Sequence, residues 1–266
     1  MKKNFTDQIN NNILVPSPPQ RIISLVPSQT ELLFYLGLEK EVVGITKFCI
    51  HPEKQFRNKP RIGGTKKFNF EKIKSLGPDL LIGNKEENQK EQIEQLMEYY
   101  PVWMSDITTL EDALEMIEEL GNMTHKTEKA NQLIEKIIIA FEPLRDFSNQ
   151  KQRLTVAYLI WNKPYMVAAD KTFINTMLQI AGFDNIFENK ERYPSISSEE
   201  LAAAQPDCIF LSSEPYPFKT KHLDELRIIC PNSTVQLVDG ELFSWYGNRL
   251  LLAARYFMDL RNSLVL

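Results

Sequence analysis

The chain has 266 residues, of which 43% are hydrophobic and 25% charged, and its formal net charge is −4. That length can form one large domain or two modest ones, and the composition is typical of a globular protein. The small negative charge argues against a broad nucleic-acid-binding surface. No apolar run reaches the roughly eighteen residues of a membrane span. The cysteines (Cys49, Cys208 and Cys230) form no CxxC pair, which argues against a zinc knuckle or a disulfide framework.

The N-terminal stretch "MKKNFTDQINNNILVPSPPQ" does not read as a signal peptide. Its basic residues, Lys2 and Lys3, are not followed by an apolar segment. Either the protein is cytoplasmic, or export information is missing from this start.

Strands and helices are predicted to alternate in the N-terminal part. Ile22–Val26 is an apolar run of strand length that Pro27 ends, and Ser28 with Glu31 then forms a capping box for a helix. Further strands are expected at Val42–Ile45, Asp79–Gly83 and Pro101–Met104, with helices near Phe70–Leu76, Gln89–Tyr99 and Leu110–Leu120. This alternation predicts a parallel α/β sheet.

One long helix is predicted from about Thr124 to Phe147. Its apolar stripe consists of Leu133, Ile134, Ile137, Ile138, Phe141 and Leu144. Afterwards the alternation resumes, with strands at Arg153–Trp161, Met166–Ala169, Cys208–Ser212 and Thr234–Val238 and helices near Thr172–Ala181, Ser197–Ala204, His222–Ile229 and Gly247–Leu260. We therefore predict an N-terminal α/β lobe over residues 1–122, a connecting helix over 123–148 and a C-terminal α/β lobe over 149–266.

A weak internal repeat supports two related lobes. "NFEKIKSLGPDLLI" (Asn69–Ile82) matches "SSEELAAAQPDCIF" (Ser197–Phe210), and in both a helix ends at Pro-Asp before a buried strand. A helix followed by Pro-Asp and a strand is also a common α/β connection, so the match has an ordinary explanation as well.

The chain resembles the vitamin-B12-binding protein family, which belongs to the helical-backbone, TroA-like substrate-binding proteins of ABC importers. The similarity lies in "RIISLVPSQTELLFYLGLEKEVVGIT", "HP", "PRIGG" and "NFEKIKSLGPDLLI", and further on in "TFINTMLQIAGFDNIFEN" and "YPSISSEELAAAQPDCIFLSSE". The resemblance implies two Rossmann-like lobes with central parallel sheets joined by one long α-helix, the class III periplasmic-binding-protein architecture. It also implies a periplasmic or membrane-associated location.

The resemblance further implies a binding protein that works as a monomer with an ABC transporter permease dimer. Its ligand would be a metal chelate, a cobalamin or other corrinoid first and a ferric siderophore or heme next, with no covalent cofactor. The family docks through one exposed acid on each lobe, and Glu71 and Glu199 match those positions.

Ligands of open α/β sheets bind beyond the carboxyl ends of the strands. Residues that follow predicted strands are therefore the candidate ligand contacts. They are Ser28, Phe48, His51, Lys66 and Phe68 in the first lobe and Trp161, Tyr165, Glu214, Tyr216, Phe218, Trp245, Tyr246 and Arg249 in the second. Their aromatic rings predict a cleft between the two lobes for a large, flat, partly apolar ligand. We expect Trp245→Ala to weaken binding without unfolding the protein. Each ring has core packing as its alternative.

Two other functions stay open. A divalent-metal receptor would need about four N, O or S ligands, and the chain offers His51 with Glu214 and Asp239 as its best set. An enzyme of unknown type is the second alternative, although "SLVPSQTE" lacks the glycines of a nucleophile elbow and no GxxxxGK[ST] loop occurs. We predict no catalytic residue and no resident metal.

Overall fold

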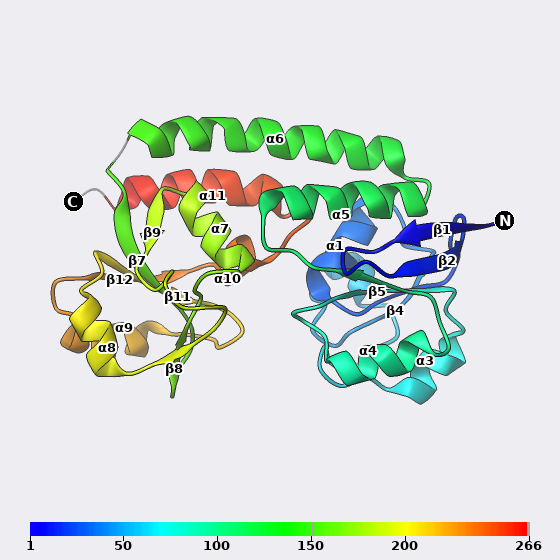
Figure 1. Ribbon diagram of the computed structural model, residues 1–266, viewed down its shortest axis with the longest axis horizontal. Helices are drawn as coiled ribbons and strands as arrows, with labels where there is room; N and C mark the ends of the chain where they lie inside the picture. The colour runs from blue at the N-terminus through cyan, green and yellow to red at the C-terminus, as the bar shows by residue number, and fades with distance from the viewer. Residues whose placement is uncertain (151, 265–266) are drawn as a thin grey trace. The chain divides into compact units, whose positions relative to one another are not determined.

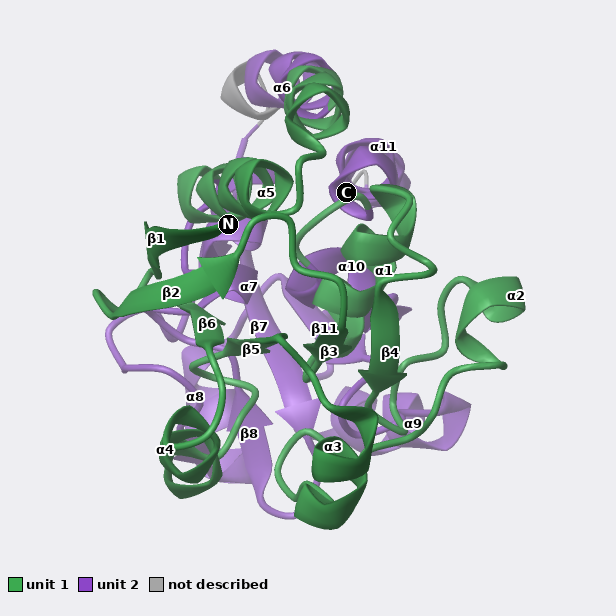
Figure 2. Ribbon diagram, turned by 90° about the vertical axis from the view of Figure 1, so that its right-hand side faces the viewer, with its two compact units in different colours: residues 1–107, 111–136, 246–248 green, residues 108–110, 137–245, 249–266 purple. Residues whose placement is uncertain are grey.

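The computed structural model describes residues 1–150 and 152–264, and for 148–150 only the backbone. The chain divides into two compact units (Figure 2). Unit 1 comprises residues 1–107, 111–136 and 246–248, and unit 2 comprises 108–110, 137–245 and 249–266. No helix within the described residues is both long and apolar enough to cross a membrane.

Unit 1 contains a four-stranded parallel sheet (Figure 1). Its strands are β3 (Ile22–Ser24), β4 (Val42–Ile45), β5 (Leu80–Asn84) and β6 (Val102–Ser105), in the spatial order β4-β3-β5-β6. The connecting helices are α1 (Pro27–Tyr35), α2 (Glu53–Phe56), α3 (Phe70–Leu76), α4 (Lys90–Met97) and α5 (Leu110–Met123).

Helices cover both faces of this sheet. Ile73 of α3 and Leu96 of α4 pack with the strand residues Ile23 and Leu81 in one hydrophobic cluster. On the other side, Gln29 of α1 donates to the Ser105 hydroxyl at 2.7 Å and approaches Met116 of α5. The predicted alternation of strands and helices in this half is confirmed.

An N-terminal hairpin was not predicted. Strands β1 (Lys2–Thr6) and β2 (Asn12–Pro16) pair antiparallel. The turn is held by Asp7, whose Oδ1 accepts the amides of Ile9 (3.1 Å) and Asn11 (2.7 Å). The Gln8 amide donates to the Met104 carbonyl at 3.1 Å, so the turn is attached to β6.

Unit 2 contains a mixed sheet of six strands within the described residues. Its path is β10 (Ser195–Ile196), β8 (Tyr165–Val167), β7 (Leu154–Trp161), β11 (Cys208–Ser212) and β12 (Thr234–Val238), and β9 (Phe183–Asn185) pairs with β7. The strands β7, β9, β11 and β12 are parallel, whereas β8 and β10 run antiparallel. The helices are α7 (Phe173–Ile180), α8 (Ser198–Ala204), α9 (Thr220–Ile229), α10 (Gly240–Ser244) and α11 (Leu250–Ser263).

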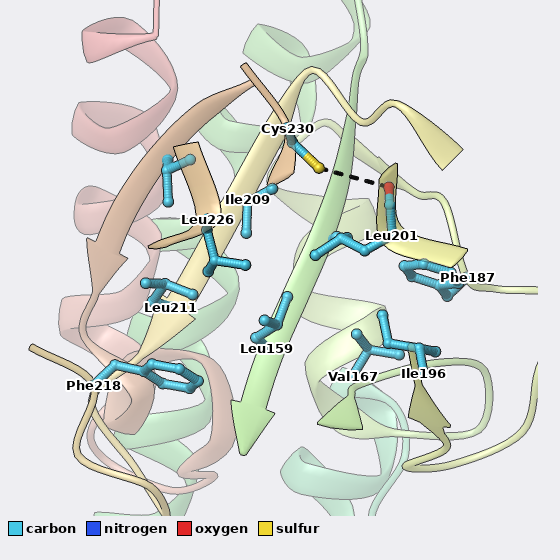
Figure 3. Close-up of a cluster of buried hydrophobic side chains, with 12 residues drawn as sticks. Leu159, Val167, Phe187, Ile196, Leu201, Ile209, Leu211, Phe218, Leu226 and Cys230 are labelled. Atoms are coloured by element: carbon cyan, nitrogen blue, oxygen red, sulfur yellow. Dashed lines mark hydrogen bonds between the residues drawn. The ribbon is translucent and has the colours of Figure 1, made fainter. Parts of the chain in front are cut away.

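Alternate residues of the central strands of unit 2 face different helix layers. Ile209 of β11 packs with Leu201 of α8 and Leu226 of α9 (Figure 3). Phe210 points the other way, and its ring centre lies 6.3 Å from that of Phe243 of α10. Period-two alternation between two buried faces explains why these strands read as continuous apolar runs.

One helix, α6 (Thr127–Gln150), begins in unit 1 and ends in unit 2. The fold is therefore the expected class III architecture of two Rossmann-like units joined by a long helix. The predicted stripe is only partly right, because Ile138 is 45% exposed. Among the described side chains of α6, the buried ones are Ala130, Leu133, Ile137, Phe141 and Leu144, at helical spacings of three and four.

The predicted capping box at Ser28 is wrong. Helix α1 begins at Pro27, Val26 is its N-cap, and no side chain caps it. Proline suits the first helical position because its missing N–H would have no partner there. Ser28 is consequently a buried residue inside the helix.

The internal repeat has a structural basis. Helices α3 and α8 are N-capped by Asn69 and Ser197, and each ends at a left-handed residue, Gly77 or Gln205, before a buried strand. The aspartate of each Pro-Asp pair accepts a backbone amide at the start of a neighbouring strand. Asp79 accepts the Arg21 amide (2.9 Å) before β3, and Asp207 accepts the Thr155 amide (2.8 Å) at β7.

Candidate functional site

The carboxyl ends of β7 and β11 lie side by side in unit 2. The two strands pair in parallel, and β8 and β9 pair with the other edge of β7. The chain therefore continues from β7 to β8 and β9 on one edge of this strand and then returns to β11 on its other edge. Such a reversal of strand order is a topological switch point, where α/β sheets bind ligands. Trp161 ends β7, and the segment Ser213–Lys219 follows β11.

Three aromatic rings meet at this end of the unit 2 sheet. The Tyr216 ring lies 5.6 Å from Trp161 and 4.8 Å from Phe218, edge-on to both. The Tyr216 amide donates to the Ile160 carbonyl at 3.3 Å, which ties the segment after β11 to β7. The Trp161 side chain is the exposed member of the group, at 40%.

Phe218 is not an exposed ring. It packs with Leu211 and Leu226 in the hydrophobic cluster between the sheet and helices α8 and α9 (Figure 3). Of the two roles predicted for this ring, ligand contact and core packing, the structure shows core packing for Phe218. Its neighbour Tyr216 is half-buried against the same cluster.

The Tyr216 hydroxyl lies between two polar side chains that were not predicted as site residues. His222 Nε2 is 3.3 Å from the hydroxyl oxygen, and Asn162 Nδ2 donates to it at 3.4 Å. His222 was predicted only as the first residue of a helix. Its position in the sequence did carry a signal. His222 is the third residue of α9, and a side chain at that position reaches back to the N-cap amide.

Glu214, which is half-buried, forms a hydrogen-bonded pair with the buried Trp245. Glu214 Oε1 accepts the indole N–H of Trp245 and the Ser244 hydroxyl, both at 2.8 Å. The Arg249 guanidinium lies 4.8 Å from the Trp245 ring and forms a 2.7 Å ion pair with Glu241. Because Trp245 is only 7% exposed, these contacts fix it inside unit 2.

Tyr165 is also used internally. It begins β8, and its hydroxyl donates to Glu225 at 2.8 Å. Burial, followed by this hydrogen bond to the carboxylate, raises the pKa of Tyr165 well above its usual range. Tyr165 is therefore not proposed as a ligand contact.

In unit 1, the loop after β4 exposes apolar side chains. Phe48 is 51% exposed and lies against Gly64, where an added Cβ would approach its Cε2 to 3.1 Å. The ammonium of Lys47 lies 5.0 Å from the Phe48 ring centre. Lys66, from the neighbouring turn, donates to the Glu86 carbonyl at 2.6 Å.

The other predicted residues of unit 1 are largely buried. Phe68 packs in the hydrophobic cluster under the sheet. Tyr246 was predicted in the second lobe but belongs to unit 1. Burial raises its pKa, and a side-chain hydrogen bond with Ser28 opposes that rise. His51, which precedes Pro52, is half-buried. Of this set, only Phe48 and Lys66 present much of their side chains to solvent.

Within residues 1–150 and 152–264, no group of three or more His, Cys, Asp or Glu side chains could hold a metal ion. Of the predicted metal set, Glu214 and Asp239 belong to unit 2, whereas His51 belongs to unit 1. The Glu214 carboxylate is hydrogen-bonded to Trp245.

Glu71 and Glu199 occupy equivalent positions in the repeat. Each is the second residue of its helix, α3 or α8, and each is exposed. The pKa of the Glu199 carboxyl is lowered, first by a hydrogen bond with its own backbone amide and then by the Ser197 side chain.

A family model described as "Periplasmic binding protein" matches residues 22–227. A vitamin B12-binding protein of Vibrio campbellii is 28% identical over 197 residues, which cover 73% of this chain and 71% of the relative. The periplasmic vitamin B12-binding protein of Vibrio cholerae has a solved structure that superposes with a TM-score of 0.81 at 23% identity, covering 94% of this chain and 99% of that one. The petrobactin-binding protein of Bacillus subtilis superposes at 0.82 with 18% identity, covering 99% of both chains. At these identities the two solved structures are similar in fold alone.

Proposed function

The chain belongs to the periplasmic binding protein family, and we propose that it is the substrate-binding protein of an ABC importer whose ligand is a corrinoid. The family covers the central three-quarters of the chain, residues 22–227. Sequence relatives whose names specify vitamin B12 favour a corrinoid over other chelates. The proposed working place is the periplasm or the outer surface of the membrane.

The observation that carries the ligand class is the exposed Trp161 ring at the carboxyl end of β7, with Tyr216 edge-on to it. A corrin ring is large, flat and partly apolar, and it brings its own metal ligands. A protein that binds it needs aromatic surface and a few hydrogen bonds rather than a cluster of metal-binding side chains. Phe48 of unit 1, which is 51% exposed, is a second proposed stacking residue.

A binding role also agrees with what the relatives do, since their names describe binding proteins. We propose no reaction for the chain and no covalent cofactor. The exposed carboxylates of Glu71 and Glu199 are the proposed contacts to arginines of the two permease subunits. Such carboxylate–guanidinium pairs are charge-assisted and directional.

The test is a titration of the purified protein with cyanocobalamin, hemin, a ferric catecholate siderophore and Zn²⁺, followed by tryptophan fluorescence. We expect saturable binding of cyanocobalamin at one site, and weakening by Trp161→Ala of about 1–3 kcal/mol through loss of ring stacking and burial. Binding of hemin or the siderophore alone would move the proposal to that chelate. Binding of Zn²⁺ alone, or of none of the four, would refute it.

A further inference from the structure

We propose that His222 fixes the Tyr216 hydroxyl as an outward-pointing hydrogen-bond donor, which makes Tyr216 a specificity-determining residue for an acceptor oxygen on the ligand. The proposal rests on the function proposed above and adds the chemistry that the ligand edge must offer. All the residues involved belong to unit 2.

The first step is the tautomer of His222. The backbone N–H of Lys219 donates to His222 Nδ1 at 2.8 Å. A backbone amide can only donate, so Nδ1 must carry a lone pair and the imidazole proton lies on Nε2. The Lys219 carbonyl lies 3.1 Å from Nδ1 but already accepts the His222 amide at 2.9 Å. This tautomer follows from the start of α9, where His222 acts as a capping-box partner.

The second step is the hydrogen-bond balance of Tyr216. With its proton on Nε2, His222 donates to the Tyr216 oxygen, which is 3.3 Å away. Asn162 Nδ2 donates to the same oxygen at 3.4 Å. The phenol oxygen then accepts two hydrogen bonds, and its own proton must point to a third group. Neither neighbour can receive it.

The third step excludes the alternative amide orientation. Asn162 Oδ1 is buried and accepts no hydrogen bond within the described residues. Turning the amide over would let Oδ1 accept the Tyr216 proton, but it would bury the NH₂ group in the place where Oδ1 has no partner. Buried N–H donors without partners are rarer than buried carbonyl oxygens that lack one. The favoured orientation of the Asn162 amide is therefore the one that points Nδ2 at Tyr216. In that orientation both Asn162 and His222 donate to the Tyr216 oxygen.

The position of the Tyr216 hydroxyl allows it to donate to a bound ligand. Tyr216 stands at the switch point of the unit 2 sheet, edge-on to the exposed Trp161 ring. A flat ligand stacked on Trp161 would bring its periphery to this hydroxyl. The peripheral group must carry an acceptor oxygen, as do the carboxamides of a corrinoid and the carboxylates of a heme. A bare or purely donating edge would leave the Tyr216 proton without an acceptor.

The tautomer can be tested directly. The chain has three histidines, so a long-range ¹H–¹⁵N correlation spectrum of the whole protein is simple, and His222→Gln assigns the signal. We expect the Nε2–H pattern for His222. An Nδ1–H pattern would overturn the proposal, because Tyr216 would then donate to His222 internally.

The ligand role is tested by titrating Tyr216→Phe beside Tyr165→Phe, whose hydroxyl is bound by Glu225. Loss of a hydrogen bond to a neutral carboxamide should weaken cyanocobalamin binding by about two- to twelvefold, and loss of one to a carboxylate should weaken hemin binding by about tenfold or more. Tyr165→Phe should leave either affinity unchanged. Equal effects of the two variants, or no effect of Tyr216→Phe, would overturn the inference.

A double-mutant cycle tests the positioning role of His222. Glutamine at this position keeps the contact to the N-cap amide, so His222→Gln should retain the thermal stability of the native protein. It should weaken binding in the native background but not in Tyr216→Phe, because it acts through that hydroxyl. A further loss in the double variant would refute the coupling. If the unmutated protein binds no chelate at all, the proposed function fails, whereas binding that Tyr216→Phe leaves unchanged refutes only this inference.

Discussion

Replacing Trp245 should cost stability rather than ligand affinity. The side chain is 7% exposed, and its indole N–H donates to Glu214 at 2.8 Å. Truncation of a buried tryptophan to alanine costs about 3–5 kcal/mol of unfolding free energy through lost burial and the remaining cavity. Trp245→Phe keeps most of the ring and its contact with Arg249 but removes the donor. Because the acceptor is a carboxylate, that variant should lose about 1.5–3 kcal/mol.

Urea denaturation followed by circular dichroism gives the unfolding free energies of both Trp245 variants. Cyanocobalamin titration of the same samples gives their affinities, and Trp161→Ala is the matched comparison. Because Trp161 is 40% exposed, its truncation should reverse the pattern, with a large effect on affinity and a small one on stability. If Trp245→Ala keeps the urea midpoint of the unmutated protein but binds ligand poorly, the assignment of Trp245 to the core is refuted, since the indole would then face the ligand.

Reversing the charge of Glu71 and Glu199 together to lysine should abolish ligand-stimulated ATPase activity of the reconstituted transporter while leaving the ligand Kd unchanged; normal stimulation would remove the docking role. Ser197→Ala should lower the unfolding free energy by about 1 kcal/mol, because its hydroxyl accepts the Glu200 amide at 3.1 Å at the start of α8; an unchanged urea midpoint would contradict that cap. Burial raises the pKa of all three thiols, that of Cys208 to about 11. An alkylating reagent at pH 8 should therefore label the protein only after unfolding, and stoichiometric labelling of the native protein would show that the thiols are accessible.

Element type and order could be predicted because the apolar patterns are strong. The runs that became β5 and β11 are buried on both faces, and the helices between them carry clear apolar faces. The start of α1 was misjudged because Ser28 and Glu31 fit a capping box by spacing alone, whereas Pro27 suits the first helical position better. The N-terminal hairpin was missed because its turn depends on the contacts of Asp7 and on a hydrogen bond from Gln8 to Met104 of β6, which is distant in sequence.

The candidate site was predicted by position but not by orientation. Sequence order put aromatic residues after the strands, which was correct for Trp161 and Tyr216. It could not say that Phe218, two residues beyond Tyr216, turns back into the hydrophobic cluster. His222 was missed as a partner of Tyr216 because their contact depends on the geometry of the loop before α9.

The tripeptide Tyr246–Asn248 limits how the chain can be divided. It belongs to unit 1, although the residues on either side of it belong to unit 2. Gly247 has a φ of +120°, and an added Cβ would lie 3.3 Å from Leu32 Cβ in α1. An N-terminal fragment cut within α6 would therefore lack a segment that packs on its own first helix. In a chimaera that exchanges C-terminal halves between relatives, this tripeptide comes from one parent and Leu32 from the other. Such chimaeras should fold well only when the two parents match at both places.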